Sequence, residues 1–462
     1  MSTLVLVWCA LPGIAASAAS SAAQARFEHP FAVDSPWNLR PIAPVLGQLV
    51  VPESKYVPMI ENTTLSTGVY LARSSDPQQV ITPCPGKPGV YDADREAMLT
   101  ELVIPRWPND AFPATGGDGH AEIVDPAMDV IHSFWQLRRT GTGWCAIHYG
   151  WSKLSGRGWG DPAHYHQGAR AAGVPSMAGL IRKHEVEDES PFYRHALAMS
   201  LDVDTGMGHK PLYVYPATST DTSAKVTHRG DIPMGTLMML PATFDSTKLR
   251  TAPLRKIAET LKLYGAYVVD SNRGTPFVIY AEIGSKLDLH QGGWNNAAAN
   301  DLQAIRAGLR NVVATSGWTD DKGRKVKPQA SAFNLLSLRG PWFLTRGSKA
   351  GTYDSFGQAL TFPKTTSPVE MQAISHNGFL RVDWAKPQPG DRYRFSVKAQ
   401  GGATLKMQID GCNGKAVESN KLGNQAYFDF AWPDQLCSIR LIANSGEDSL
   451  PSSIEATLIQ LP

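Results

Sequence analysis

Charge, cysteine and long apolar runs are all scarce in this chain. Charged residues make up 19% of its 462 residues and the formal net charge is +2, with no basic block, so nucleic acid binding has no electrostatic support. No CxxC pair and no Cys/His zinc spacing occurs, which argues against a structural zinc site. The chain also has no G-x-S-x-G and no glycine-rich nucleotide motif after a strand. We therefore expect no serine hydrolase, no cofactor and no nucleic acid partner.

The first residues predict export. The uncharged apolar run from Leu4 to Ala19 is too short to span a membrane, and Ala23-Gln24-Ala25 fits the small-x-small cleavage rule. No Lys or Arg precedes this run, which departs from an ordinary signal peptide. We interpret residues 1–25 as a signal peptide and expect a secreted protein, periplasmic or extracellular, without a membrane span.

Four cysteines remain once Cys9 is removed with the signal peptide. They form an early pair, Cys84 and Cys145, and a late pair, Cys412 and Cys437. An even number in an oxidising compartment predicts one disulfide within each pair. The alternative is four free buried thiols.

Glycine (41) and proline (33) are frequent, and short runs with strand-like alternation recur. These features predict a mainly β fold, with a β-sandwich or jelly-roll-like main domain over residues 26–335 that carries a few short helices. Period-two alternation predicts a C-terminal β-sandwich over residues 345–462, either carbohydrate-binding or purely structural. The charged segment 320–327 predicts an exposed link, so a fragment that ends near Gly323 is expected to fold alone.

Several elements can be placed within the main domain. The turn sequence from Asp125 to Asp129, between two alternating apolar runs, predicts a β-hairpin. Apolar spacing predicts helices at residues 175–186, 253–264 and 300–309, with Thr251 as a cap of the second. Buried strands are expected at residues 266–269 and 277–281.

The stretch from His120 to His195 holds seven of the twelve histidines and four tryptophans. Imidazoles transfer protons near neutral pH, and aromatic faces stack on sugar rings. We predict a ligand site here. The expected substrate-binding residues are Trp135, Trp151, Trp159 and Arg182.

Motifs in a fixed order carry a family resemblance. They are DSPWN at 34–38, HAEIVD at 120–125, AAGVPSMAGLIR at 171–182 followed by His195-Ala196-Leu197, and YGAYVVD at 264–270. This pattern resembles a family of secreted, largely uncharacterised bacterial proteins over about residues 30–315. The resemblance implies one secreted β-rich domain with a shared site, and it implies no particular reaction. The chain departs from the pattern at His164-Tyr165-His166.

Five residues are predicted to be catalytic. His120 begins a strand after a glycine loop and is an acid/base candidate, and His195 precedes an apolar strand. Tyr215, Asp221 and Arg229 belong to a polar set of the kind that a polysaccharide lyase uses. The alternatives are buried structural histidines and an ordinary polar loop. Asp270, at a strand end, is interpreted as the start of an Asx-turn.

A metal is not expected, although Asp161, His164 and His166 form a weak alternative because a His-x-His pair can bind zinc or manganese. The favoured hypothesis is an enzyme that cleaves an extracellular polysaccharide, and a lyase acting on a uronate-containing glycan is preferred. A glycoside hydrolase needs paired carboxylates, for which the candidates are Asp118, Glu122, Asp221 and Glu282, but no pairing is visible from the sequence. The third hypothesis is a non-catalytic carbohydrate-binding or envelope surface protein.

Overall fold

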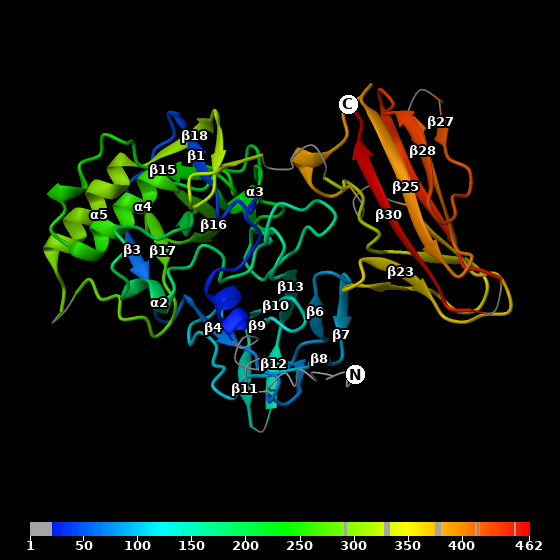
Figure 1. Cartoon of the computed structure of the whole chain (residues 1–462), viewed down its shortest axis with the longest axis horizontal. Coiled ribbons are helices and arrows are strands. Elements are labelled where there is room, and N and C mark those ends of the chain that lie inside the picture. The colour runs from blue at the N-terminus through cyan, green and yellow to red at the C-terminus, as the bar shows by residue number, and fades with distance from the viewer. Residues whose placement is uncertain are drawn as a thin grey trace, which may run out of the picture.

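A computed structural model describes residues 21–141, 143–290, 293–327, 333–374, 380–411, 414, 416–447 and 450–462. As predicted, the fold is mainly β with few short helices (Figure 1). Three separate groups of buried apolar side chains form its cores. In this described part, no helix is long and apolar enough to cross a membrane.

One core lies against a six-stranded sheet and a four-stranded sheet. The six-stranded sheet contains, in spatial order, β4 (Thr67–Leu71), β9 (His120–Asp125), β10 (Val130–Trp135), β13 (His148–Lys153), β6 (Val90–Asp92) and β7 (Ala97–Leu99). The four-stranded sheet contains β11 (Arg138–Thr140), β12 (Gly143–Ala146), β5 (Gln79–Pro83) and β8 (Leu102–Ile104). β9 and β10 form the predicted hairpin. Its turn is fixed by the Asp125 carboxylate, which accepts hydrogen bonds from the amides of Ala127 and Met128.

The largest core surrounds a mixed seven-stranded sheet. Its strands are, in spatial order, β2 (Val45–Leu46), β18 (Arg310–Ala314), β15 (Leu237–Met239), β16 (Ala266–Asn272), β14 (Leu197–Asp202), β17 (Phe277–Tyr280) and β3 (Met59–Glu61). The helices α4 (Ala252–Leu263) and α5 (Asn296–Gly308) pack beside it (Figure 1). The predicted stripe of α4 is buried, and Gly265, with φ +77, ends that helix.

Smaller elements complete this part of the chain. A three-stranded sheet joins β1 (Arg40–Ile42), β19 (Gly317–Thr319) and β20 (Lys325–Val326). Two α-helices of one turn each are α2 (Lys183–Val186) and α3 (Ala224–Thr227), and a 3-10 turn covers Ser246–Lys248. Residues 320–327, predicted to be an exposed link, contain an ordered turn, because the Asp320 carboxylate accepts hydrogen bonds from the amides of Lys322 and Arg324.

Two five-stranded antiparallel sheets make up the C-terminal sandwich, drawn in yellow to red (Figure 1). The first contains β21 (Phe343–Arg346), β24 (Glu370–Ile374), β29 (Leu436–Asn444), β26 (Thr404–Gly411) and β27 (Ala416–Glu418). The second contains β22 (Thr352–Asp354), β23 (Ala359–Phe362), β30 (Ser452–Gln460), β25 (Arg392–Gln400) and β28 (Ala426–Ala431). A 3-10 turn, Asp383–Ala385, lies between β24 and β25. The predicted alternation is observed, since Leu405, Met407 and Ile409 all point into the core.

The helix predicted over residues 175–186 is wrong except for its last turn, α2. Backbone groups in its first half bind other elements: the Ser176 amide donates to Glu122, and the Gly179 carbonyl accepts from Ala198. Gly179 has φ +68, and a Cβ there would meet the Trp37 ring at 2.3 Å. Tertiary partners therefore replace helical hydrogen bonds in this stretch.

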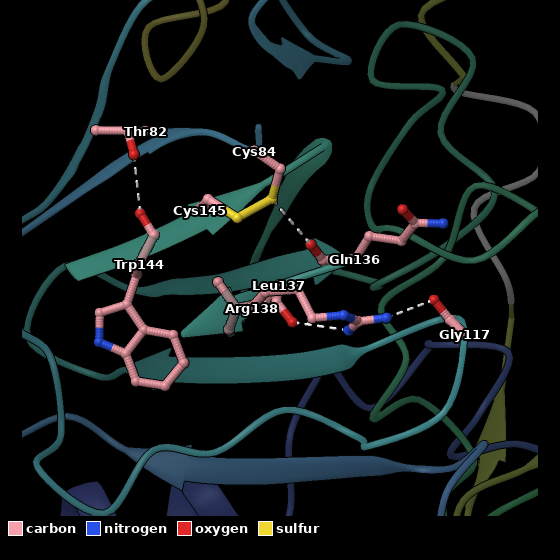
Figure 2. The surroundings of a disulfide bond; sticks show 8 residues. All are labelled: Thr82, Cys84, Gly117, Gln136, Leu137, Arg138, Trp144 and Cys145. Atoms are coloured by element: carbon pink, nitrogen blue, oxygen red, sulfur yellow. Dashed lines mark hydrogen bonds between the residues drawn. A yellow bond between two sulfur atoms is a disulfide. The ribbon is translucent and has the colours of Figure 1, made fainter. Parts of the chain in front are cut away.

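Cys84 and Cys145 form the predicted disulfide, with a Cα–Cα distance of 4.8 Å (Figure 2). It ties β12 to the segment after β5. Cys84 Sγ also approaches the Gln136 carbonyl oxygen at 3.8 Å, which is a contact only, because a disulfide sulfur has no proton to donate. Cys437 is disulfide-bonded as well, and its predicted partner Cys412 lies outside the described residues.

Candidate functional site

Strand register places His120, Trp135 and His148 in one row across β9, β10 and β13. His120 lies beside Trp135 because Ala121 pairs with Phe134, and Trp135 pairs directly with His148. The next row on the same face contains Glu122, Ser133 and Gly150. Directly opposed residues in adjacent strands have Cβ atoms about 5 Å apart, so these polar side chains form one patch.

The loop of residues 166–176 crosses this patch. Gly150 allows the crossing, because a Cβ at that position would meet the Gly168 backbone at 3.1 Å. The Ala169 amide then donates to Ser133 Oγ (2.9 Å), and the Ser176 amide donates to Glu122 Oε1 (2.6 Å). The loop thus holds Arg170 and Ser176 over the sheet.

The hydrogen bonds of His120 determine which ring nitrogen carries the proton. Its Nδ1 lies 3.2 Å from the Phe134 carbonyl oxygen and 3.0 Å from Ser176 Oγ. A carbonyl can only accept, so Nδ1 carries the hydrogen and the lone pair is on Nε2. Burial, reinforced by the Arg170 charge, lowers the pKa of His120 well below its usual value. The ring is therefore neutral at physiological pH with its lone pair on Nε2, and the same lowered pKa makes it a weaker proton acceptor than a free imidazole.

Glu122 lies behind His120 and is completely buried. It accepts hydrogen bonds from Ser133 Oγ (2.6 Å) and from Ser176. Burial raises its pKa to about 7, against the weaker opposing effect of those hydrogen bonds. Ser176 therefore links the Nδ1 side of the histidine to a carboxyl group that can exist in either protonation state near neutrality.

Arg170 is 3% exposed and is only partly partnered. Its Nη1 donates to Asp270 Oδ2 at 2.9 Å, and its guanidinium lies 3.9 Å from the centre of the Tyr280 ring. Its Nε and Nη2 atoms are buried and have no hydrogen-bond partner among the described residues. These two atoms form the edge that binds a carboxylate side-on, as Arg106 binds Asp125 here at 2.8 and 3.0 Å.

Acidic groups lie near Arg170 and come from different parts of the chain: Asp270 from β16, and Asp118 and Asp221 from loops. Asp270 lies in β16, and burial raises its pKa to about 6 although the Arg170 charge opposes the rise. The charges of Asp221 and Asp118 raise it further, so these carboxylates lie near Asp270. The predicted Asx-turn interpretation of Asp270 misses this role, although its carboxylate does also accept the Ser271 amide.

The glycine loop before His120 is held firmly. Arg138 donates through Nη2 to the carbonyls of Gly116 and Gly117, and Figure 2 shows the bond to Gly117. Asp118 accepts from Trp135 Nε1 at 3.1 Å, and its carbonyl accepts the Gln136 amide. Trp135 is half-buried, so part of its ring can meet a ligand beside His120.

Two further predicted residues, His195 and Arg182, belong to a separate buried cluster. His195 Nε2 pairs with Glu185 at 3.1 Å, and Arg182 Nε pairs with Glu282 at 2.9 Å. Burial would lower the pKa of His195, but the Glu185 carboxylate outweighs it and raises that pKa. Both ring nitrogens of His195 face acceptors, the Ala196 carbonyl oxygen and the Glu185 carboxylate, so the ring has no lone pair free to take a proton from a ligand.

Tyr215, Asp221 and Arg229, which were predicted as one polar set, have separate partners in the structure. Asp221 lies near Asp270 and pairs with His228 at 3.2 Å. The Tyr215 hydroxyl accepts from Arg157 at 2.7 Å, and Arg229 is an exposed partner of Asp204. Of the five predicted catalytic residues, the structure brings only His120 and Asp221 to the Arg170 region.

The remaining predicted aromatic and metal-binding residues serve packing and hydrogen bonding. Trp159 is fully buried and stacks on Trp37, and Trp151 is 1% exposed and donates to Asp94, so neither presents a free ring face. His164 pairs with Asp94 at 3.1 Å. The Asp161 carboxylate accepts nearby amides, and His166 lies beside His148. Within the described ranges, no group of three or more His, Cys, Asp or Glu residues could hold a metal ion.

No family model matches the chain, and no curated protein matches it. Similar solved structures include an accessory secretory protein complex of Streptococcus pneumoniae, with 10% identity, a TM-score of 0.20, and coverage of 30% of this chain and 100% of that one. A xylan-binding domain has 17% identity, a TM-score of 0.18, and coverage of 29% and 97%. A family two carbohydrate esterase from Cellvibrio japonicus has 11% identity, a TM-score of 0.17, and coverage of 29% and 34%. Similarity this low carries no argument about function.

Proposed function

We propose that this chain is a secreted enzyme that cleaves a uronate-containing polysaccharide by β-elimination. The observation that carries the proposal is the Nε/Nη2 edge of Arg170, which has no hydrogen-bond partner in the part of the chain that the structure describes, beside a neutral His120. Unmet donors on a buried cation cost free energy, and a bound uronate carboxylate would recover it. The Cys84–Cys145 disulfide supports export, since disulfides persist in oxidising compartments.

In the proposed reaction, Arg170 binds the uronate carboxylate and makes the proton at C5 more acidic. His120 Nε2 takes that proton, the C5–H electrons form a C4=C5 double bond, and the C4–O bond breaks. The imidazolium then gives the proton to the leaving oxygen, so charge and atoms balance. Trp135 would stack on a sugar ring next to the cleaved bond.

A glycoside hydrolase is the second candidate, because Glu122 and Asp270 have raised pKa values of about 7 and about 6. A carboxylic acid that is protonated near neutrality is what an inverting or retaining hydrolase needs as its acid. Glu122 Oε1 is held by Ser133 and Ser176, and its Oε2 is buried without a hydrogen-bond partner in the described residues, so neither oxygen reaches solvent and this mechanism is the weaker one.

The test is to incubate the protein with a panel of uronate polysaccharides and follow unsaturated-uronate absorbance and reducing ends together. A lyase raises both, a hydrolase raises reducing ends alone, and a non-catalytic binding protein raises neither. Arg170→Lys keeps the charge but loses the bidentate edge, so it should reduce elimination by at least tenfold. Arg394→Lys, which alters an equivalent edge bound to Asp429 in the C-terminal sandwich, is the matched control and should keep full activity.

A further inference from the structure

A hollow of about 340 Å³ lies where the C-terminal sandwich meets the rest of the chain. Tyr215 lines it from one side. Trp384, Gln388, Asp391 and Gln460 line it from the other. The two sides are joined by direct hydrogen bonds, including Trp384 Nε1 to the Ala217 carbonyl and the Asp383 amide to the Tyr213 hydroxyl at 3.1 Å. Both walls of the hollow are therefore fixed relative to each other.

Three aromatic rings line this hollow. Tyr215 and Trp384 meet edge to face, with ring centres 5.0 Å apart. Phe333 lies 5.9 Å from Tyr215 and 5.8 Å from Trp384. All three rings are partly exposed, and Tyr215 is 37% exposed. Partly exposed rings held in a concave site are suited to the apolar face of a sugar ring.

The rim of the hollow is polar but carries little unbalanced charge. Gln460 Nε2 donates to Asp391 at 2.8 Å, and Lys386 pairs with Asp383 at 2.5 Å. Gln388 donates to the Lys386 carbonyl through its amide nitrogen, which leaves its amide oxygen as an acceptor. Amides and a carboxylate around aromatic rings match sugar hydroxyls better than they match a polyanion.

A second hollow of about 400 Å³ adjoins the first across Phe333. Arg157 lies between them: it donates to the Tyr215 hydroxyl, and its guanidinium is 5.2 Å from the Phe333 ring centre. Gln167, which is only 5% exposed, lines this second hollow, and its Oε1 is buried without a hydrogen-bond partner in the described part of the chain. An unmet acceptor in a roomy hollow is a place for a hydroxyl donor.

We propose that these two hollows form one groove, the junction groove, which binds an uncharged stretch or face of an oligosaccharide away from the cleavage site. The inference rests on the proposed polysaccharide substrate. It places the carbohydrate-binding surface of the C-terminal sandwich at the edge that contacts the main part, and not on the outer face of its sheet. On that outer face, Tyr427 is 58% exposed, but Arg394 covers its ring at 4.2 Å while bound to Asp429.

The experiment measures binding separately from cleavage, by affinity electrophoresis of the full-length His120→Ala protein in gels containing neutral or uronate polysaccharides. Adding Gln388→Ala or Tyr215→Leu should weaken retardation at least fivefold. Tyr427→Leu, an exposed aromatic outside the groove, is the matched control and should not change it. Circular dichroism of each variant verifies that it is folded.

Unchanged retardation in folded Gln388→Ala and Tyr215→Leu variants, or a loss confined to Tyr427→Leu, would overturn the junction groove. If the proposed reaction is wrong and the junction groove is right, wild-type protein gives no unsaturated product, and retardation still depends on Tyr215 and Gln388. Absence of retardation on every polysaccharide of the panel would also reject the groove.

Discussion

At the scale of single residues, His120 is the side chain on which the proposed chemistry depends most directly. We expect His120→Gln to lower turnover by about 10²–10⁴-fold, because no other neutral imidazole in the described site has its Nδ1 hydrogen fixed by both a carbonyl and a serine. Initial rates on the best polysaccharide of the panel measure this, and thermal melts verify the fold.

His195→Gln is the control for that substitution. It breaks the ion pair with Glu185 in a separate cluster, so the melting temperature should fall while turnover stays within about threefold of wild type. The opposite pattern, with normal turnover in folded His120→Gln and loss in His195→Gln, would move the chemistry to the Glu185 cluster.

Glu122 gives a pH-dependent prediction. Its folded pKa of about 7 is above the unfolded value of 4.5, so the folded state binds more protons and this group destabilises the protein as pH rises from 4.5 to 7. His120, with its lowered pKa, has the opposite effect below pH 6.5. Glu122→Gln removes only the first effect.

The stability of Glu122→Gln relative to wild type should therefore increase with pH across that window, by up to about 1.4 kcal/mol per pH unit. Urea unfolding of both proteins at pH 5, 6 and 7 measures the difference. A difference that stays constant with pH would show that Glu122 is ionised throughout.

At the scale of elements, local patterns predict what local forces decide. The hairpin of β9 and β10, helix α4 and the alternating strands of the sandwich follow from apolar period and turn residues, and all three are found. The helix over 175–182 fails because its amides bind Glu122 and neighbouring strands, which no local pattern reveals. Helix α5 begins four residues earlier than predicted, because Asn295 caps it.

The site was predictable only in part, for the same reason. Residue type and the neighbouring sequence identified His120 as a catalytic candidate and Trp135 as a substrate-binding candidate. Arg170 and Asp270 meet only because the 166–176 loop crosses from one sheet toward the other. Glu122 was predictable as one of the four carboxylate candidates for a hydrolase, whereas the only signal for Ser176 was its place in the AAGVPSMAGLIR motif.

The Cys84–Cys145 disulfide allows a prediction about β5 and β12. The cysteines are 61 residues apart, so removing the cross-link frees a long loop in the unfolded chain. The double variant Cys84→Ser, Cys145→Ser should lose about 4 kcal/mol of stability on the chain-entropy estimate. Urea unfolding checks it, and a loss below about 1 kcal/mol would show that the sheet contacts alone hold these strands.

At the scale of the whole molecule, one buried carboxylate joins the C-terminal sandwich to the main part. Asp94 is 1% exposed and accepts hydrogen bonds from Trp151 Nε1 at 2.9 Å and from Ser355 Oγ and Gln358 Nε2 at 2.8 Å. It also forms ion pairs with Arg339 and His164. Burial alone would raise the pKa of Asp94, but the Arg339 charge and the contacts with His164 and Ser355 outweigh it and hold that pKa far below its usual value.

The charged segment 320–327 suggests that a fragment ending near Gly323 folds alone. The contacts of Asp94 lead us to expect that it does not. A fragment of residues 26–323 lacks Arg339, Ser355 and Gln358, so Asp94 would remain a buried charge with most of its partners missing. Removing one partner of a buried pair typically costs 3–5 kcal/mol, and the fragment should therefore lose cooperative melting.

In the full chain, Asp94→Asn should lower the melting temperature and separate a single calorimetric transition into two. The control Asp429→Asn breaks a partly exposed pair with Arg394 and should cost less than about 1 kcal/mol. A fragment that melts cooperatively at the wild-type temperature would show that the sandwich is only appended, and it would also remove the fixed second wall on which the junction groove depends.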